Sequence, residues 1–247
     1  MKKRMIAGLL AGMALTASAA VLSDFEMNDA ANTRLAQLQN SASGAGQFNY
    51  GANNMLADGN GLLVYTLGGT NANYARAALA TQTNSGIQKM TFSIDSATLA
   101  GSNGKLSYAI RDQTAGKDVV MAQLVKNNDR LRLVMQDWGA GHVANLTAVG
   151  VYDLPDVLNV EVIYDLDSDL ADFSWTMGSD SGTATNVAIG NYTAEVVRNV
   201  YQPKDMLDTD FIKVDYLKVE SVPEPATLGL FGLIGGAVLF VRRRFMI

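Results

Sequence analysis

The chain has 247 residues, of which 19 are Lys or Arg, 24 are Asp or Glu, one is His and none is Cys. The lack of cysteine excludes disulfides, thiolate metal sites and thiol catalysis, so the fold must depend on its own hydrophobic core. Six basic residues and one acidic residue lie in the terminal segments, which leaves thirteen basic and twenty-three acidic residues at positions 21–220. The formal charge of this middle part is therefore −10, and an acidic surface repels phosphates, which argues against a nucleic-acid partner.

The first segment has the features of a signal peptide. Residues 2–4 are basic, and an apolar run of 11 residues follows from Met5 to Leu15. A run of this length is too short to cross a bilayer core of ~30 Å as a helix. Ala17-Ser18-Ala19 then offers the small-residue pattern that signal peptidase cleaves. We therefore predict a signal peptide over residues 1–20, with cleavage after Ala19 or Ala20.

Short segments of alternating polar and apolar residues fill positions 21–220. The alternation is clearest in Ile87–Ile94, Lys105–Arg111 and Arg130–Gln136. A period of two places one side of a strand in a core and the other side in solvent. Further strands are expected at Leu62–Leu67, Asp118–Lys126, Val143–Val151, Val157–Asp165, Ala171–Met177, Ala184–Ile189 and Phe211–Val219.

Turn-forming sequences separate these segments. Gly101–Gly104 and Gly178–Gly182 are rich in turn residues, and Asn127–Asp129 fits a tight hairpin between two strands. Asn28–Gln39 is compatible with a short helix or a loop, and Thr193–Tyr201 with a helix or a strand. No long helical crossovers separate the strands, so we predict an all-β fold for 21–220, a two-sheet antiparallel sandwich.

Three aspartates alternate at Asp165, Asp167 and Asp169. This spacing places three carboxylates on one side of a turn, and Ca²⁺ prefers such hard oxygen ligands. The segment is not an EF-hand, because its sixth position is Leu170 instead of Gly and its twelfth is Thr176 instead of Glu. A solvated acidic turn is the alternative interpretation.

Aromatic rings are candidates for stacking on sugars, since their flat faces suit the C–H surfaces of pyranose rings. Trp138 is the strongest candidate because Asp137–His142 has the composition of a loop at the end of a strand, where function concentrates. Trp175 is the second candidate. Packing in the core or at its rim is the alternative for both. Six tyrosines complete the set: Tyr50, Tyr65, Tyr74, Tyr108, Tyr152 and Tyr192.

The sequence shows no catalytic constellation. His142 is the only histidine, and no Gly-x-Ser-x-Gly motif accompanies it. Glu161 and Glu195 are present, but no acidic strand motif joins them into the carboxylate pair of a glycosidase. We therefore expect no catalytic residues and no enzymatic activity.

The C-terminal segment, 221–247, joins three elements in order. Val222 is followed by Pro223, Glu224 and Pro225, and an apolar stretch of sixteen residues at 226–241 then leads to the arginines. Sixteen residues give roughly 24 Å of helix. Bilayer thinning and snorkelling arginines can close the gap to a core of ~30 Å. We predict a single transmembrane helix at about 226–241, with the arginines cytoplasmic. These are Arg242, Arg243 and Arg244.

This order of elements resembles the PEP-CTERM sorting signal of Gram-negative-type bacteria. The resemblance implies that Pro223, Glu224 and Pro225 are recognised by an exosortase, a membrane transpeptidase-like protease. It also implies transient residence in the inner membrane, followed by release or attachment at the cell surface, often within extracellular polysaccharide. Removal of the tail and its retention as an anchor both stay open.

The middle of the chain resembles concanavalin-A-like jelly rolls and carbohydrate-binding-module sandwiches. The similarity rests on Ser23–Glu26, just after the signal, and on Val214–Val219, just before the sorting tail. Val160–Asp165 followed by Phe173–Thr176 also fits laminin-G-like domains. The resemblance implies a structural Ca²⁺ between neighbouring first and last strands, with separate exposed carboxylates as the alternative. The ligands would be Asp24, Glu26 and Asp215.

Together these features predict an exported protein of the cell surface or extracellular matrix. Its middle domain is expected to be a non-catalytic binding or structural module that contacts polysaccharide. The alternative is a secreted polysaccharide-active hydrolase or lyase on the same fold. A cleft with two carboxylates, or a basic groove lined by tyrosines, would favour the enzyme, whereas a shallow face with one or two exposed rings would favour binding.

Overall fold

A computed structural model describes residues 19–34, 37–48, 55–59, 63–66, 73–101, 104–127, 129–136, 141–201, 207 and 209–222. These residues belong to one compact unit, Ala20–Val222, apart from Ala19. The predicted signal peptide up to residue 18, the predicted transmembrane helix and the sorting residues from Pro223 to Arg244 lie outside them. Within the described ranges, no helix is long and apolar enough to cross a membrane.

The described residues form fourteen strands, as the alternating sequence predicts. They are β1 (Val21–Phe25), β2 (Met55–Ala57), β3 (Leu63–Thr66), β4 (Asn73–Thr83), β5 (Ile87–Thr98), β6 (Lys105–Asp112), β7 (Lys117–Asn127), β8 (Arg130–Gln136), β9 (Gly141–Asn145), β10 (Leu158–Asp165), β11 (Leu170–Met177), β12 (Asp180–Ala188), β13 (Ala194–Tyr201) and β14 (Phe211–Val222).

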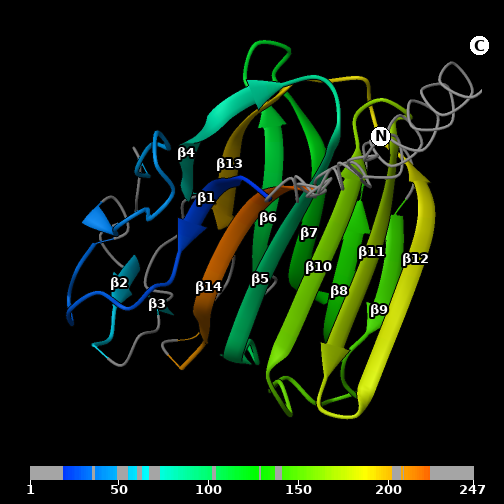
Figure 1. Cartoon of the computed structure of the whole chain (residues 1–247). Helices are drawn as coiled ribbons and strands as arrows, with labels where there is room; N and C mark the ends of the chain where they lie inside the picture. Colours follow the sequence, from blue (N-terminus) through cyan, green and yellow to red (C-terminus); the bar gives the residue numbers. More distant parts are fainter. Residues whose placement is uncertain are drawn as a thin grey trace, which may run out of the picture. The chain divides into compact units, whose positions relative to one another are not determined.

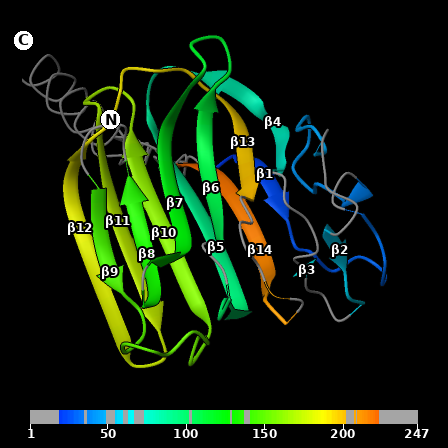
Figure 2. The ribbon, with the colours of Figure 1, turned by 180° about the vertical axis from the view of Figure 1, so that it is seen from behind.

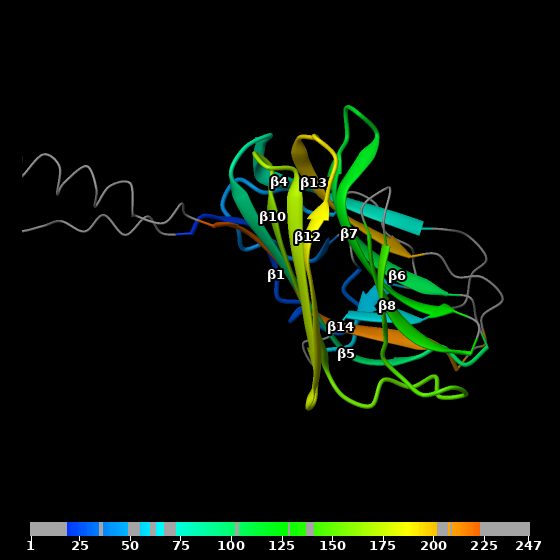
Figure 3. The same cartoon turned by 90° about the vertical axis from the view of Figure 1, so that its right-hand side faces the viewer.

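The strands form two antiparallel sheets. One is eight-stranded, with the order β12-β11-β10-β5-β14-β3-β2 and with β1 also paired to β14 (Figure 1). The other is six-stranded, with the order β4-β13-β6-β7-β8-β9, and it faces the viewer in Figure 2. The edge-on view separates the two layers (Figure 3). The predicted all-β sandwich of two antiparallel sheets is therefore confirmed.

The core lies between the two sheets. Strand β10 shows how the sequence builds it, because buried Leu158, Val160, Val162 and Tyr164 alternate with more exposed residues. Phe92 of β5 meets Tyr108 of β6 across the layers, with ring centroids 4.8 Å apart. Alternate residues from each sheet thus fill the space between them without disulfides.

Strand β14 occupies a central place in the eight-stranded sheet. It pairs with β5 along its whole length. On its other edge it pairs first with β3, over Phe211–Val214, and then with β1, over Leu217–Glu220. The strand ends at Val222, where Pro223 follows in the sequence. Proline has no N–H to donate to a ladder, which explains the end of the strand at this point.

The structure differs from the sequence-based prediction in several segments. Strand β4 was not expected, because its four alanines favour helix. The expected strand Val143–Val151 is wrong beyond Asn145, where a turn closed by Val151 N–H and the Ala148 carbonyl follows. The expected turn Gly178–Gly182 is limited to residues 178 and 179, because Met177 already pairs with Asp180.

The two ambiguous segments are also settled. Thr193–Tyr201 contains strand β13, and the described part of Asn28–Gln39 is a loop. Asn32 N–H donates to the Ala57 carbonyl at 2.8 Å, which ties this loop to β2.

Candidate ligand-binding face

The outer face of the six-stranded sheet collects arginine side chains. Tyr108 and Ile110 of β6 point into the core, so the alternate positions 107, 109 and 111 point outward. Arg198 of β13 lies opposite Ala109 of β6 on one side and opposite Arg76 of β4 on the other. Residues that lie opposite one another point to the same side of a sheet, so Arg198 and Arg76 also point outward. Five of the six arginines at positions 21–220 occupy outward positions, and we call this surface the arginine face. They are Arg76, Arg111, Arg130, Arg132 and Arg198.

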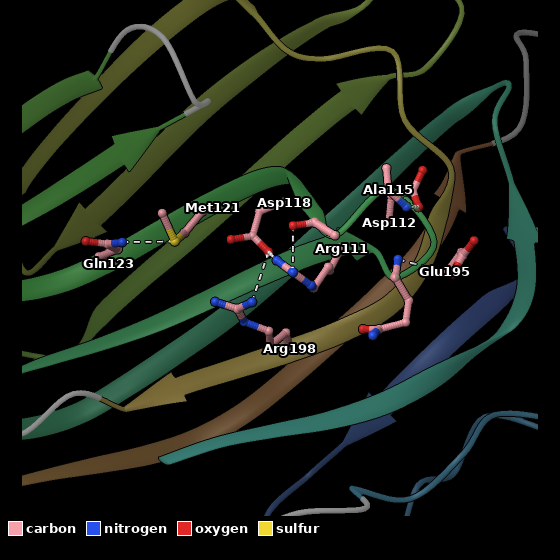
Figure 4. Close-up of polar contacts among 10 residues, drawn as sticks. Arg111, Asp112, Ala115, Asp118, Met121, Gln123, Glu195 and Arg198 are labelled. Atoms are coloured by element: carbon pink, nitrogen blue, oxygen red, sulfur yellow. Dashed lines mark hydrogen bonds and ion pairs between the residues drawn. The ribbon is translucent and has the colours of Figure 1, made fainter. Parts of the chain in front are cut away.

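Asp118 of β7 holds two of these arginines. Its Oδ1 accepts a hydrogen bond from Arg111 Nη1 at 2.9 Å and lies 3.6 Å from Arg198 Nη1 (Figure 4). The Asp118 side chain is only 4% exposed, compared with 14% for Arg111 and 18% for Arg198. Arg111 Nη2 also donates to the Gly116 carbonyl at 2.6 Å. Two guanidinium groups are therefore held in place by groups of the sheet itself.

Arg76 brings a third guanidinium group to the same place. It lies directly opposite Arg198, and opposite residues on one face of an antiparallel pair have Cβ atoms about 4.5–5.5 Å apart. Arg76, Arg111 and Arg198 thus extend from the neighbouring strands β4, β6 and β13 on the same face as Asp118 of β7.

Neutral polar side chains lie beside the arginines on the same side of the six-stranded sheet. Ser107 of β6 lies opposite Gln123 of β7, and both are buried. Gln123 Nε2 contacts Met121 Sδ at 2.9 Å, and both side chains extend from β7 (Figure 4). The buried side-chain atoms without a hydrogen-bond partner among the described residues include Ser107 Oγ, Arg111 Nε and Arg132 Nε on this face. Such atoms are rare in folded proteins, and a bound ligand or water is one explanation for them.

Two further carboxylates lie where β6 turns into β7, and both hold backbone groups. Asp112 accepts hydrogen bonds from Ala115 N–H at 2.6 Å and from Thr193 N–H at 3.0 Å. Glu195 accepts from Gln113 N–H at 3.2 Å and from Thr114 Oγ1 at 3.0 Å. These bonds fix the turn between Arg111 and Asp118, and thereby the spacing of the arginine face.

The eight-stranded sheet offers a second, shallower surface. An open depression of about 240 Å³ is lined by Thr91, Asn159, Val160, Glu161, Ser174, Trp175, Thr176 and Tyr216. Charges near it are matched: Lys89 lies 3.6 Å from both Glu161 and Glu220, and Lys218 lies 2.7 Å from Glu220. Burial, then the charges of Asp215 and Glu161, raises the pKa of Tyr216. This surface offers neutral polar groups without an excess of charge.

The aspartates of the β10–β11 turn hold backbone groups. Asp165 Oδ1 accepts from Asp167 N–H at 2.9 Å, and its Oδ2 accepts from Ser168 Oγ at 2.7 Å. The Ser168 bond, followed by the Asp167 backbone bond, lowers the pKa of Asp165. Asp167 Oδ2 accepts from Gly86 N–H at 2.9 Å, which links this turn to the β4–β5 turn. Asp169 adopts a positive φ of 55°. These bonds account for the shape of the turn, and a cation site at Asp165, Asp167 and Asp169 stays a prediction.

Strands β1 and β14 are neighbours, as the resemblance to carbohydrate-binding sandwiches implies. However, Asp24 lies opposite Lys218, and Glu26 accepts a hydrogen bond from Asn28 at 2.9 Å. Burial, together with the nearby charge of Asp95, raises the pKa of Asp215. No group of three His, Asp or Glu residues within reach of one metal ion is found in the part of the chain that the structure describes. A structural Ca²⁺ therefore stays a prediction.

Of the two tryptophans predicted to stack on sugars, only Trp175 lies among the described residues. It is partly buried and packs against the core. Its ring covers Gly182 of β12, where an added Cβ would stand 2.5 Å from Trp175 Nε1. This arrangement agrees with the packing alternative, and its sugar-stacking role stays a prediction. Trp138 falls between β8 and β9 in the sequence and outside the described residues, while His142 is the second residue of β9 and is exposed.

The C-terminal residues provide the decisive comparison. Residues 221–244 match the model of the PEP-CTERM protein-sorting motif. The chain therefore carries a PEP-CTERM protein-sorting motif at residues 221–244. The motif indicates an exported protein that an exosortase sorts, as its Pro-Glu-Pro triplet, apolar stretch and arginines predict. It starts at Ser221, the last residue but one of β14. A search of curated proteins finds no match to the chain.

The fold of the described domain is similar to that of lectins and glucanases. The lectin UEA-II complexed with galactose is 8% identical, with a TM-score of 0.51 over 83% of this chain and 100% of that one. An endo-1,3-beta-glucanase from Streptomyces sioyaensis is 12% identical, with a TM-score of 0.51 over 84% and 98%. A seed lectin from Lotus tetragonolobus is 11% identical, with a TM-score of 0.50 over 83% and 100%. These likenesses support the concanavalin-A-like jelly roll, and at such low identity they concern the fold alone.

Sequence reasoning missed the arginine face. A signal for part of it was present, because the alternation that predicted strands at Lys105–Arg111 and Arg130–Gln136 also places Arg111 and Arg132 on their polar sides. The addition of Arg76 and Arg198 depends on which strands become neighbours, and no local pattern reveals that.

Proposed function

We propose that this protein is an exported, non-catalytic module that binds polysaccharide at the cell surface or in the extracellular matrix. The arginine face is the binding surface. The observation that carries the proposal is the set of fixed planar hydrogen-bond donors there, since Arg111 and Arg198 are both oriented by Asp118. Preorganised donors lose little entropy when they bind a hydroxyl or an anionic group of a sugar.

The same observation argues for binding over hydrolysis. Glycosidases of the usual kind need two carboxyl groups about 5 to 10 Å apart, one of them free to donate a proton. Asp118 is the carboxylate placed among the arginines, and its Oδ1 is already engaged by two of them. Asp112 and Glu195 are used by the β6–β7 turn. We therefore propose that the protein binds its polysaccharide without cleaving it.

A lyase is the second candidate, because arginines can neutralise a uronate carboxylate and so acidify the neighbouring C–H bond. Binding and cleavage can be separated in one experiment. The full-length chain, purified in mild detergent, is passed over immobilised polysaccharides, and the eluate is assayed for new reducing ends and for unsaturated uronate. Retention without either product supports the binding module. Release of either product would show that the protein is an enzyme and would overturn the non-catalytic binding module. If the chain is retained on none of the polysaccharides, the result counts against both the binding module and the enzyme.

A further inference from the structure

We propose that the open depression on the outer side of the eight-stranded sheet binds one unit of a neutral polysaccharide. Tyr216 stacks on the sugar ring, and Asn159 and Glu161 bind its hydroxyl groups. This site goes beyond the proposed function, because it lies on the other sheet from the arginine face and takes an uncharged ligand. Its existence does not depend on whether the arginine face binds a polysaccharide.

The strand register gathers the lining side chains on the outer side of the sheet, on four strands that lie side by side in Figure 1. In β10 the side chain of Val160 is buried in the core, so Asn159 and Glu161 point outward. Ser93 of β5 lies opposite both Asn159 and Tyr216, so Tyr216 of β14 also points outward. Tyr216 and Asn159 are thus separated by two strand spacings, about 10 Å. Opposite residues on β5 and β11 complete the outward set: Thr91, Ser174 and Thr176.

The register also decides which aromatic ring a sugar can reach at this depression. Trp175 lies opposite Val160, whose side chain is buried, and its own ring covers Gly182 on the inner side of the sheet. These two residues therefore meet the depression through their backbone. Tyr216 points outward and is only partly buried, so its ring is the one that borders the depression. A flat ring with a polar edge suits the C–H surface of a pyranose unit.

The neutral polar side chains of the depression are not used by the fold. Elsewhere in this sheet polar side chains bind one another, as where Thr98 Oγ1 donates to Asp153 Oδ1 at 2.5 Å. At the depression, five side chains make no hydrogen bond to another described residue: Thr91, Asn159, Ser174, Thr176 and Tyr216. Each of their hydroxyl or amide groups both donates and accepts, as the hydroxyl groups of a sugar do. A sugar unit therefore matches the groups that the sheet leaves available here.

The charges around the depression favour a neutral ligand. Lys89 lies 3.6 Å from both Glu161 and Glu220, and Lys218 lies 2.7 Å from Glu220, so two positive and two negative side chains balance one another. The charge of Asp215 acts on Tyr216, whose pKa it helps to raise. An anionic polymer would meet this carboxylate without a free cation to offset it among these four paired side chains.

The size of the depression sets the length of the ligand. Its volume of about 240 Å³ is below the roughly 300–1,000 Å³ of sites that enclose drug-sized ligands. It therefore accepts a single sugar unit. Because the depression is open, the neighbouring units of a polymer continue over the surface of the sheet.

The test measures the binding of neutral polymers to the full-length chain by calorimetry, in a detergent without a sugar headgroup. The neutral probes are dextran, laminarin and galactomannan, and carboxymethyl-dextran is the charged probe. We expect at least one neutral polymer to bind, with an affinity that stays constant from about 0.05 to about 0.5 M salt, because the contacts involve no ionic group of the ligand.

Four substitutions locate the site. Tyr216→Ala removes the stacking ring and should raise the Kd about 10-fold, whereas Tyr216→Phe keeps the ring and should raise it at most about 3-fold. Asn159→Ala, at an exposed position, should raise the Kd about 5-fold, the effect of losing one neutral hydrogen bond. Tyr152→Ala removes a half-buried ring from the β9–β10 connection and should leave the Kd unchanged. Circular dichroism checks that each variant is folded.

The outcomes separate this inference from the proposed function. If none of the neutral polymers binds, the inference is overturned, while binding of carboxymethyl-dextran would leave the proposed function standing. Binding of a neutral polymer that Tyr216→Ala and Asn159→Ala do not weaken would place the site elsewhere and would also overturn the inference. Weaker binding in both variants, with Tyr152→Ala unaffected, supports it. If Tyr216→Ala does not fold, Asn159→Ala decides between these outcomes.

Discussion

The hydroxyl of Tyr164 donates a hydrogen bond of 2.6 Å to Gln88 Oε1, and both residues are buried within the eight-stranded sheet. They face one another across β10 and β5. Tyr164→Phe would leave a buried amide oxygen without its donor, so we expect a loss of about 1–3 kcal/mol in the free energy of unfolding. Urea denaturation measures it. Tyr216→Phe, at a half-buried ring, serves as the control and should change stability by no more than about 0.5 kcal/mol.

The same tyrosine should make stability sensitive to alkali. Burial raises the pKa of Tyr164 above its ordinary value of 10.0. The unfolded chain therefore loses this proton near pH 10 while the folded chain keeps it, so the contribution of Tyr164 to stability is present below about pH 10 and declines above it. The difference between the wild-type protein and Tyr164→Phe should shrink as pH rises past that value. A constant difference up to pH 11 would contradict the prediction.

Asp118→Asn should destabilise the six-stranded sheet. The substitution keeps the size of the side chain but removes the charge that holds Arg111 and Arg198, leaving two arginines side by side. Because Asp118 is almost fully buried, we expect a loss of about 2 kcal/mol, whereas an exposed ion pair is worth about 0–1 kcal/mol. Asp129→Asn, at a carboxylate 42% exposed beside Arg130, is the matched control. Equal effects of the two substitutions would show that burial does not strengthen the Asp118 contacts.

Glu220 should contribute to stability at neutral pH and lose its contribution in acid. Its hydrogen bond from Lys218 lowers its pKa below the ordinary 4.5. A depressed pKa stabilises the fold above the unfolded value, and the stabilisation disappears as pH falls through the folded value. Glu220→Gln should therefore cost about 0.5–1 kcal/mol at pH 7 and nothing at a pH below the folded pKa. Thermal melts across this range test it, with Glu26→Gln as the control at an exposed site.

Gly182→Ala should displace the Trp175 ring. An added Cβ would stand 2.5 Å from Nε1 and 2.9 Å from Cε2, so the ring must move away from β12. Overpacking of this kind costs about 1–3 kcal/mol. In a Trp138→Phe background Trp175 is the only tryptophan, and its fluorescence should shift towards that of a water-exposed indole. Ser181→Ala, at the neighbouring exposed position, should leave both stability and emission unchanged.

The local alternation of polar and apolar residues was sufficient to predict most of the strands. The period of two in Ile87–Ile94 and Lys105–Arg111 reports which side of each strand is buried, and this follows from side-chain chemistry alone. It was insufficient for β4, whose alanines prefer helix and become a strand through pairing with β13. The sorting motif was recognisable because all of its parts are contiguous.

The site depends on non-local geometry, which is why the sequence did not reveal it. Arg76 and Arg198 lie far apart in the chain and meet only because β4 pairs with β13. The acidic turn is the opposite case, because its groups are contiguous in the sequence, and the cation site expected there stays a prediction. Asp165 and Asp167 are close in sequence and have the spacing of a cation site, yet their oxygens accept backbone N–H groups of their own and a neighbouring turn.

The position of β14 has a consequence for export. Ser221 N–H donates to the carbonyl of Ala20, and the two residues are 201 positions apart. A chain that crosses the membrane from its N-terminus therefore presents β1 and β5 long before their shared partner arrives. Until β14 is available, the edges of β1, β3 and β5 that pair with it stand open to aggregation, and such non-local pairing is slow. Because β14 ends at Val222, the sheet is completed only by residues that directly precede the Pro-Glu-Pro triplet, so folding of the domain and exposure of the sorting motif fall next to one another in the chain.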